Sequence, residues 1–194
     1  MLRSLYKEAL WRMDKKKPEI YLTFDDGPIP EMTPWVLDVL RDYGVKATFF
    51  CVGDNIRKHP TVFGKLLAHG HQLGNHTYNH LKGWKTNTAE YLRNVAQCQE
   101  LTNTHLFRPP YGRLKPSQYK VLKQQYTLAF WDVLSYDYDH FTSPENCLRN
   151  VTRYTREGSI VLFHDSIKAS QNLKYALPKY LEHCLNLNYT FATL

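Results

Sequence analysis

Short apolar runs alternate with amphipathic segments along most of the chain. The runs are rich in aromatic and β-branched residues, a composition typical of strands. They cover residues 19–24, 46–52, 126–131, 159–164 and 189–194, with shorter candidates at 71–74 and 105–107. Because each run is apolar almost throughout, both faces of these strands are expected to be buried, as they are in a parallel sheet covered by helices.

The intervening segments repeat apolar residues at the three- and four-residue spacing of helices. Helices are expected over residues 54–68, 88–101, 116–124, 144–156 and 173–187, and another has an apolar face made of Val36, Leu37, Leu40 and Tyr43. Thr33 is the expected cap of that helix, Pro34 its first residue and Gly44 its end. The alternation predicts one α/β domain, either doubly wound or closed into a barrel.

Residues 1–18 precede the first strand as an N-terminal extension. A short amphipathic helix is expected over residues 4–13, with Leu5, Ala9 and Leu10 on one side, and packing onto the domain is favoured over membrane contact. The extension is charged too often to hold the apolar core of a secretory signal, and no apolar run reaches the ~20 residues of a membrane span. A cytoplasmic or membrane-peripheral location is therefore expected.

The chain of 194 residues carries 25 Lys and Arg against 18 Asp and Glu, a formal net charge of +7. This balance suits an anionic partner such as a nucleic acid, a cell-wall polymer or a membrane surface. Because no RNA-binding or DNA-binding signature is present, a nucleic acid is not expected. The four cysteines are widely spaced with no CxxC pair, which favours ordinary buried thiols.

Polar clusters follow the apolar runs, and they are FDDGP, NHTYNH, RPPYG, WDVLSYDY and FHDS. In a parallel α/β domain the C-terminal ends of all strands lie at one edge, where such folds build their active sites. The sequence therefore predicts that five separated clusters meet at one rim.

The first two clusters hold the residue types of a metal site. A turn needs only one aspartate, and the adjacent carboxylates of Asp25 and Asp26 repel each other unless a cation or a proton lies between them. His76 and His80 are four positions apart, close enough to share an ion. One carboxylate and two imidazoles, with positions left for water and substrate, are typical of a catalytic zinc-type site. The other aspartate is then free to take a proton from water, which favours hydrolysis of an amide or ester.

Hydrolysis also needs an acid for the leaving group. His164 is the candidate, although a histidine can simply end a strand and bond a carbonyl. Arg108 is a candidate partner that keeps the basic aspartate ionised, and the alternative is a surface salt bridge. Two prolines follow Arg108 and stiffen the backbone there, which would be unusual for a surface salt bridge.

The ordered series TFDDGP, HTYNH, RPPYG and IVLFHD resembles the motifs of the NodB-homology polysaccharide deacetylases, carbohydrate esterase family 4. The resemblance extends from Tyr21 to Asp165. It implies a single domain over residues 19–194, a distorted (β/α) barrel of about seven strands. It also implies removal of acetyl groups from N-acetylated sugars, and less often from O-acetylated ones.

The resemblance implies a role for each matching residue. Asp25 corresponds to the general base, and Arg108 to the residue that positions this base. Asp26, His76 and His80 correspond to the ligands of one divalent ion, with zinc expected and cobalt, nickel or manganese as alternatives.

The second half of the site is implied in the same way. The backbone N–H of Tyr111 corresponds to the oxyanion donor, His164 to the general acid, and Leu162 and Pro110 to the substrate pocket. Asp137 is the better match for the carboxylate that orients the acid, and Asp132 is the competing one. The chain departs from the family at Tyr138, which aligns with the usual pocket tryptophan and adds a hydroxyl to an aromatic wall.

The expected partner is an acetylated carbohydrate, such as peptidoglycan or a chitin-like oligosaccharide, bound by a monomer. Three enzyme or binding alternatives stay open: an O-acetyl esterase on glycans, a relative without metal that opens cyclic amides, and an inactive glycan-binding relative. The intact ligand set of Asp26, His76 and His80 argues against the second and third.

Overall fold

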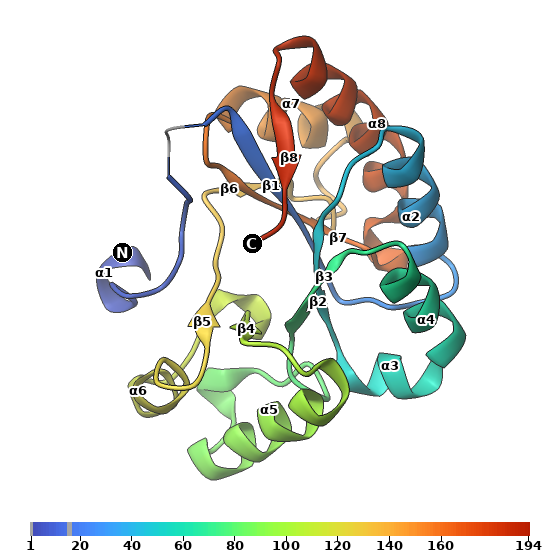
Figure 1. Ribbon diagram of the computed structural model, residues 1–194. Helices are drawn as coiled ribbons and strands as arrows, with labels where there is room; N and C mark the ends of the chain where they lie inside the picture. Colours follow the sequence, from blue (N-terminus) through green and yellow to red (C-terminus); the bar gives the residue numbers. More distant parts are fainter. Residues whose placement is uncertain (1, 15–16) are drawn as a thin grey trace.

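Parallel strands form the centre of the molecule in the computed structural model, which describes residues 2–14 and 17–194. The strand order is β5 (Thr127–Leu128), β4 (Leu106–Phe107), β3 (Gln72–Asn75), β2 (Thr48–Cys51), β1 (Glu19–Asp25), β7 (Ile160–His164) and β6 (Val133–Leu134). An eighth strand, β8 (Thr190–Ala192), pairs with the start of β1. The expected (β/α) barrel of about seven strands in one domain is confirmed (Figure 1).

Helices surround the sheet on its outer side (Figure 1). They are α2 (Thr33–Asp42), α3 (Gly53–Lys58), α4 (Pro60–Ala68), α5 (Thr88–Thr102), α6 (Pro116–Leu122), α7 (Pro144–Tyr154) and α8 (Ser170–Asn186). Short 3-10 turns lie at η1 (Gly83–Lys85), η2 (Pro110–Gly112) and η3 (Ile167–Ala169), and α1 (Leu2–Leu5) begins the described chain. None of the described helices is both long enough and apolar enough to span a bilayer.

The core is continuous around β1, whose residues after Glu19 are all buried. Phe24 stacks on Phe49 of β2 with ring centroids 4.9 Å apart, and Phe163 of β7 flanks it on the other side. Burial of a large apolar side chain contributes roughly 1.5–3 kcal/mol, so these apolar runs favour a strand covered on both faces. The four cysteines are buried free thiols, as expected: Cys51, Cys98, Cys147 and Cys184.

The helix expected over residues 54–68 is in fact two helices. α3 ends at Lys58 and α4 begins at Pro60, with His59 between them at φ -127° and ψ 55°. Proline disfavours helical geometry in the preceding residue and has no N–H to continue the hydrogen-bond ladder. The prediction followed the apolar spacing and overlooked this break.

The start of α2 also differs from the prediction. Thr33 is already inside the helix, and Met32 is the residue before it, with no capping hydrogen bond from its side chain. The Thr33 hydroxyl accepts from the Ile29 N–H at 2.9 Å and donates to Asp165 at 2.5 Å. Thr33 therefore ties the loop after β1 to the end of β7.

The strand expected over residues 126–131 is shorter, and β6 was not predicted. β5 stops at Leu128 because the next two carbonyls, of Ala129 and Phe130, accept hydrogen bonds from the buried side chain of Arg108. The chain then turns away and pairs with β7 only over two residues. Two residues are too few to show strand periodicity in the sequence.

The helix expected over residues 4–13 is limited to α1, and bends, a turn and two isolated β-bridges at Leu10 and Arg12 follow it. The Leu10 N–H donates to the Leu128 carbonyl at 2.8 Å, and the Phe130 N–H donates to the Leu10 carbonyl at 2.7 Å. The Tyr6 hydroxyl donates to the carbonyl of Leu114 and accepts from its N–H, both at 2.9 Å. These bonds join the segment to β5 and to the loop after η2, while the domain boundary at residue 18 stays a prediction.

We expect Tyr6→Phe to lower the free energy of unfolding by about 1–3 kcal/mol, because it leaves the N–H and the carbonyl of buried Leu114 without their shared partner. Chemical denaturation measures this change. The exposed Tyr154 offers the matched control Tyr154→Phe, which should leave stability unchanged. Equal stability of the two variants would contradict a structural role for the Tyr6 hydroxyl.

Candidate active site

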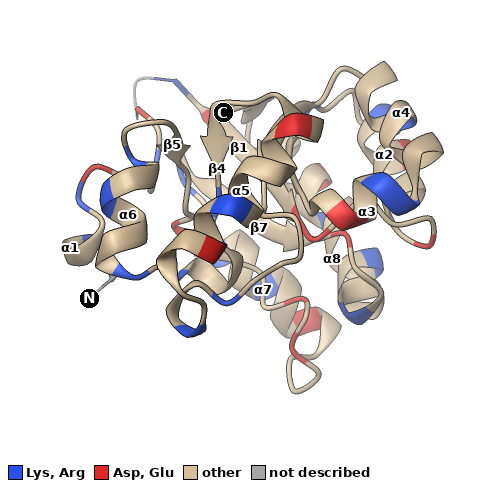
Figure 2. Cartoon of the chain, turned by 90° about the horizontal axis from the view of Figure 1, so that it is seen from below, with Lys and Arg blue, Asp and Glu red and all other residues tan. Residues whose placement is uncertain are grey.

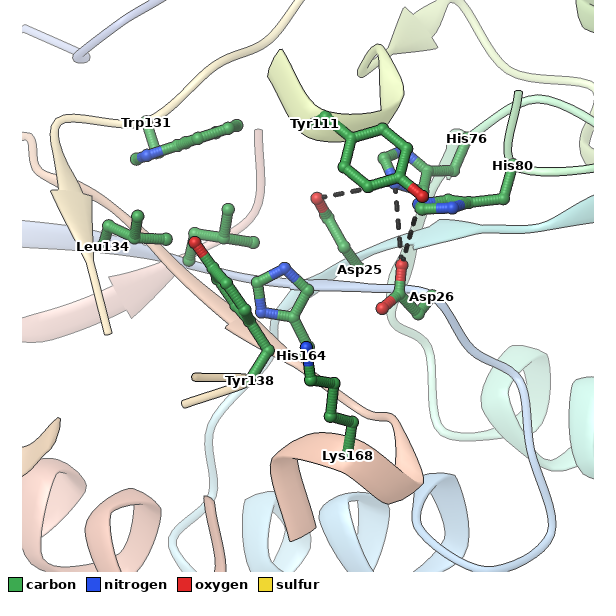
Figure 3. Close-up of a pocket in the computed structure, with 11 residues that line it drawn as sticks. Asp25, Asp26, His76, His80, Tyr111, Trp131, Leu134, Tyr138, His164 and Lys168 are labelled. Carbon is green, nitrogen blue, oxygen red and sulfur yellow. Dashed lines mark ion pairs between the residues drawn. The ribbon is translucent and has the colours of Figure 1, made fainter. Parts of the chain in front are cut away.

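A cavity of about 380 Å³ opens at the C-terminal ends of the strands. Its lining comes from β1, β6, β7 and the loops that follow β1, β3, β4, β5, β6 and β7, and consists of Asp25, Asp26, His76, His80, Tyr111, Trp131, Leu134, Tyr138, Leu162, His164 and Lys168 (Figure 3). Residues from all five predicted polar clusters thus meet at one rim, as the parallel topology requires.

Asp26, His76 and His80 form one cluster at the end of β1 and β3. The Nε2 atom of His80 lies 3.2 Å from the Asp26 carboxylate, and the Nε2 atom of His76 lies 3.8 Å from it. One candidate ligand atom from each residue lies within 4.8 Å of the others. This spacing and donor set fit one divalent ion, with coordination positions left over for water and substrate.

The protonation states of the cluster also fit a metal site. The Nδ1 atom of His76 donates to the backbone carbonyl of Arg108 at 2.7 Å, so Nε2 carries the lone pair that faces Asp26. Burial lowers the pKa of His76 to about 4, which keeps the imidazole neutral. Burial opposes ionisation of Asp26, but the hydrogen bond from His80 and the nearby histidines outweigh it and hold its pKa below the ordinary value.

Unusual backbone conformations concentrate around this cavity. Positive φ angles occur at Asp26 (86°), Thr77 (63°), His80 (53°), Tyr111 (60°) and Tyr136 (58°). Such angles are uncommon for residues other than glycine and persist where the surrounding structure enforces them. The loops at the strand ends are therefore held in conformations that the side chains themselves do not prefer.

Asparagine side chains hold two of these loops. The Asn75 amide donates to the Val95 carbonyl at 2.9 Å and accepts from the Thr77 N–H at 2.9 Å. The Asn55 amide donates to the backbone carbonyl of Asp26 at 2.7 Å. Neither asparagine was predicted, because asparagine is common in loops and its partners are distant in sequence.

Asp25 makes a buried ion pair with Arg108. The guanidinium is fully buried and its Nη1 atom lies 2.8 Å from Asp25 Oδ1 and 2.8 Å from the Thr23 hydroxyl. The guanidinium carbon lies 4.0 Å from the centroid of the Phe50 ring. Because Arg108 is fully buried, the surface salt-bridge alternative does not apply.

His164 pairs with Asp137, and within the sheet it is the register partner of Asp25 on the neighbouring strand β1. The His164 Nδ1 and backbone N–H donate to the two Asp137 oxygens at 2.8 Å and 2.7 Å. Burial lowers the pKa of His164, but the charge and hydrogen bond of Asp137 outweigh it and raise the pKa to about 9.

Asp132 does not reach His164. Its carboxylate accepts from the N–H of Ile160 at 2.9 Å and from the Ser159 hydroxyl at 3.2 Å. These residues lie at the start of β7, whereas His164 is its last residue. Of the two aspartates considered from the sequence, Asp137 is therefore the one that contacts the histidine.

The remaining predicted residues divide into two groups. Leu162, Tyr138 and Tyr111 line the cavity, and the Tyr138 ring meets His164 edge-on with centroids 4.9 Å apart. Pro110 is buried in η2 beside Tyr111 and is not among the lining residues.

Sequence reasoning missed Trp131, Leu134 and Lys168, which also line the cavity. Trp131 and Leu134 both lie within the WDVLSYDY cluster, before its predicted site residues. The aromatic and apolar residues of that cluster were the sequence feature that could have identified them. An indole therefore lines the pocket although Tyr138 occupies the aligned position. Lys168 stands beyond the FHDS cluster, and a lone lysine gave no signal.

Asp165, at the end of the IVLFHD motif, was also given no role from the sequence. Its carboxylate accepts from the N–H of Gly27 at 3.0 Å. A Cβ atom at Gly27 would lie 2.0 Å from Asp165 Oδ2, so only glycine fits there. The glycine of TFDDGP thus permits a close contact that fixes the loop after Asp25 and Asp26.

Comparison with known proteins supports the class that the motifs resemble, the polysaccharide deacetylases. Residues 12–129 match the sequence profile of a family described as polysaccharide deacetylase. A peptidoglycan-N-acetylglucosamine deacetylase of Bacillus cereus is 36% identical over 157 residues, which cover 77% of this chain and 57% of that protein. A second such deacetylase of Bacillus cereus is 31% identical over 192 residues, 95% of this chain and 90% of that protein.

Solved structures agree. The crystal structure of a peptidoglycan N-acetylglucosamine deacetylase in complex with an N-oxidanyl-benzamide has a TM-score of 0.91 at 32% identity, covering 96% of this chain and 91% of that one. Fold and sequence thus define a hydrolase of glycan amide bonds. The chain belongs to the polysaccharide deacetylase family, the NodB-homology group of carbohydrate esterase family 4.

We expect Arg108→Met to lower the free energy of unfolding by about 3–5 kcal/mol, because the substitution leaves Asp25 as an uncompensated buried charge and removes donors from two carbonyls. Arg41→Met is the control, since Arg41 makes exposed ion pairs with Asp38 and Asp42 that contribute little. Denaturant titration of both variants measures the difference. If Arg108→Met lowered the free energy of unfolding as little as Arg41→Met, a stabilising role for the buried Arg108–Asp25 pair would be contradicted.

Proposed function

We propose that this protein is a metal-dependent deacetylase that removes acetyl groups, mainly N-acetyl, from a glycan such as peptidoglycan or a chitin-like oligosaccharide. The observation that carries the proposal is the pair of ion pairs that each place one partner, Asp25 or His164, in the cavity that the Asp26, His76 and His80 cluster also lines. One pair joins the Asp25 carboxylate to the Arg108 guanidinium, and the other joins the protonated imidazole of His164 to the Asp137 carboxylate. The relatives' names support the choice of an acetylated glycan.

Asp26, His76 and His80 would hold one divalent ion, with zinc the expected metal and cobalt, nickel or manganese as alternatives. When bound, such an ion polarises the acetyl carbonyl and makes water a better nucleophile near neutral pH. The neutral state of His76 and the ionised state of Asp26 suit this ligand set.

Asp25 acts as the general base. Its Oδ1 atom is engaged by Arg108 at 2.8 Å, while Oδ2 lies 3.7 Å from His76 and faces the cavity. Asp25 therefore has one oxygen fixed and one directed to the place where the attacking water would lose its proton. Arg108 holds the carboxylate in position for this step.

His164 acts as the general acid. Asp137 fixes Nδ1, so Nε2 is the nitrogen that points into the cavity and donates a proton to the leaving amine (Figure 3). The backbone N–H of Tyr111 would stabilise the oxyanion that forms as the carbonyl is attacked. Leu162, Trp131 and Leu134 supply an apolar wall of suitable kind for the acetyl methyl group.

An O-acetyl esterase would use the same residues, but its leaving alcohol needs less help from an acid than an amine does. The raised pKa of His164 keeps a proton available at neutral pH for the amine that an amide substrate releases. An inactive glycan-binding protein would need neither ion pair, and both are intact.

We expect Asp25→Asn to reduce acetate release from N-acetylated glycans by about 10² to 10⁴-fold, the usual contribution of a general base. Acetate release by the zinc-loaded protein from peptidoglycan and chitin oligomers measures this loss. The variant should still bind one zinc per chain, whereas Asp26→Ala should lose the ion. Unchanged acetate release by a correctly folded Asp25→Asn protein would show that another group removes the proton.

We expect kcat/KM to fall as pH rises through the pKa of His164, because only the protonated imidazole donates to the leaving group. That pKa is raised to about 9, chiefly by Asp137 against the effect of burial. Asp137→Asn removes this charge, so the basic limb of the profile should move to lower pH. A bound cation moves the limb down in both proteins and leaves the sign of their difference unchanged. If the basic limbs of the wild type and of Asp137→Asn coincided, the proposal that Asp137 supports His164 as the acid would be contradicted.

A further inference from the structure

Three aromatic rings line the cavity, and a cation lies over each of them. Arg108 lies 5.7 Å from the Trp131 ring, but this guanidinium is buried and engaged with Asp25. The other two cations are exposed lysines. The Lys82 ammonium lies 5.2 Å from the centroid of Tyr111, and the Lys168 ammonium lies 5.7 Å from that of Tyr138.

Lys168 itself lines the cavity, and Lys82 lies over a ring that lines it. Tyr138 meets His164 at 4.9 Å between centroids, so Lys168 lies on the side of the acid. Tyr111 meets His80 at 4.8 Å, so Lys82 lies on the side of the metal cluster. Figure 3 shows Lys168 and Tyr138 on the same side of His164, with Tyr111 over the histidine cluster.

Across residues 2–14 and 17–194, neither ammonium has an Asp or Glu oxygen within salt-bridge distance, in contrast to Lys58 and Lys123. A missing partner alone does not mark a binding residue, because Lys179 on α8 also lies over a tyrosine without an ion pair. The position beside the cavity is what separates Lys82 and Lys168 from Lys179. Acidic and basic residues are interspersed over the helices in the view of Figure 2.

We propose that Lys82 and Lys168 select acetylated glycans that carry carboxylates close to the acetamido group. This inference rests on the proposed deacetylase function, because it places the acetyl group in the cavity and the amine near His164. The sugar carbon that bears the amine then lies at the mouth. Substituents on its two neighbouring ring carbons and on the adjoining sugar extend from the mouth, where the two ammonium groups stand.

A carboxylate beside Lys82 or Lys168 gains a charge-assisted hydrogen bond, and no protein carboxylate among the described residues competes for that ammonium group. A hydroxyl at the same place gains only a neutral one, which is weaker. The two lysines act on binding and leave the reacting atoms untouched, so the discrimination belongs in KM. Because both ammonium groups are exposed, salt should weaken the effect.

The test compares three substrates of the same kind of backbone. They are a peptide-free peptidoglycan strand with free carboxylates, the same strand with its carboxylates methyl-esterified, and a neutral chitin oligomer. The proteins are the zinc-loaded wild type, Lys82→Gln, Lys168→Gln and their double variant, with Lys179→Gln as the control that loses a similar cation–aromatic contact on α8. Acetate release and calorimetric binding are both measured.

Each single substitution should raise KM for the free-carboxylate strand about two- to fivefold, as expected for one exposed charge pair, with kcat unchanged. The esterified strand and the chitin oligomer should show no such loss, Lys179→Gln should match the wild type, and the difference should shrink toward 1 M salt. Equal losses on all three substrates, or none on the free-carboxylate strand, would overturn the proposal.

The two proposals fail differently. Absence of acetate from every substrate with wild-type protein would remove the deacetylase function. The lysine proposal is decided by the calorimetric comparison of the free and esterified strands, which needs no turnover. Normal acetate release combined with equal affinity of wild type and double variant for the free-carboxylate strand would remove only the lysine proposal.

Discussion

The buried guanidinium of Arg108 is the constraint on which the site depends. The guanidinium donates to the carbonyls of Ala129 and Phe130 and to the side chains of Thr23 and Asp25. The backbone carbonyl of Arg108 accepts a hydrogen bond from His76. One residue after β4 thereby fixes two side chains of β1, a histidine after β3 and the chain beyond β5. A buried charge is tolerated only when it is paired and its donors are satisfied, so the strand ends must converge around it.

The same principle sets two ion pairs of opposite order a short distance apart. A cation lies beside the Asp25 carboxylate, whereas a carboxylate beside His164 favours the imidazolium. Arg108, Asp25 and Asp137 are buried and His164 is largely buried, so neither interaction is diluted by solvent to the extent of a surface pair. The proposed base and the proposed acid can therefore coexist in one cavity at neutral pH.

Most of this convergence could be predicted because it follows from topology. Once Asp25, His76, Arg108 and His164 are placed after parallel strands, the sheet brings them to one edge whatever the loops do. Other features needed information that lies far away in the sequence. β6 is too short to show a period, and β5 ends where Arg108 takes the carbonyls that a longer strand would use. Periodicity reflects burial along one segment, so it cannot reveal a distant side chain such as Arg108 that competes for the strand's carbonyls.

Specificity is less predictable than chemistry for a related physical reason. The reacting side chains sit on or directly after buried strands, where a change disturbs the core. Lys82, Tyr111 and Lys168 belong to or adjoin the turns η1, η2 and η3, and their own side chains are exposed. These turns can change charge without moving Asp25 or His164. Proteins that share this barrel can therefore keep one hydrolytic mechanism and differ in the glycan that their rim accepts.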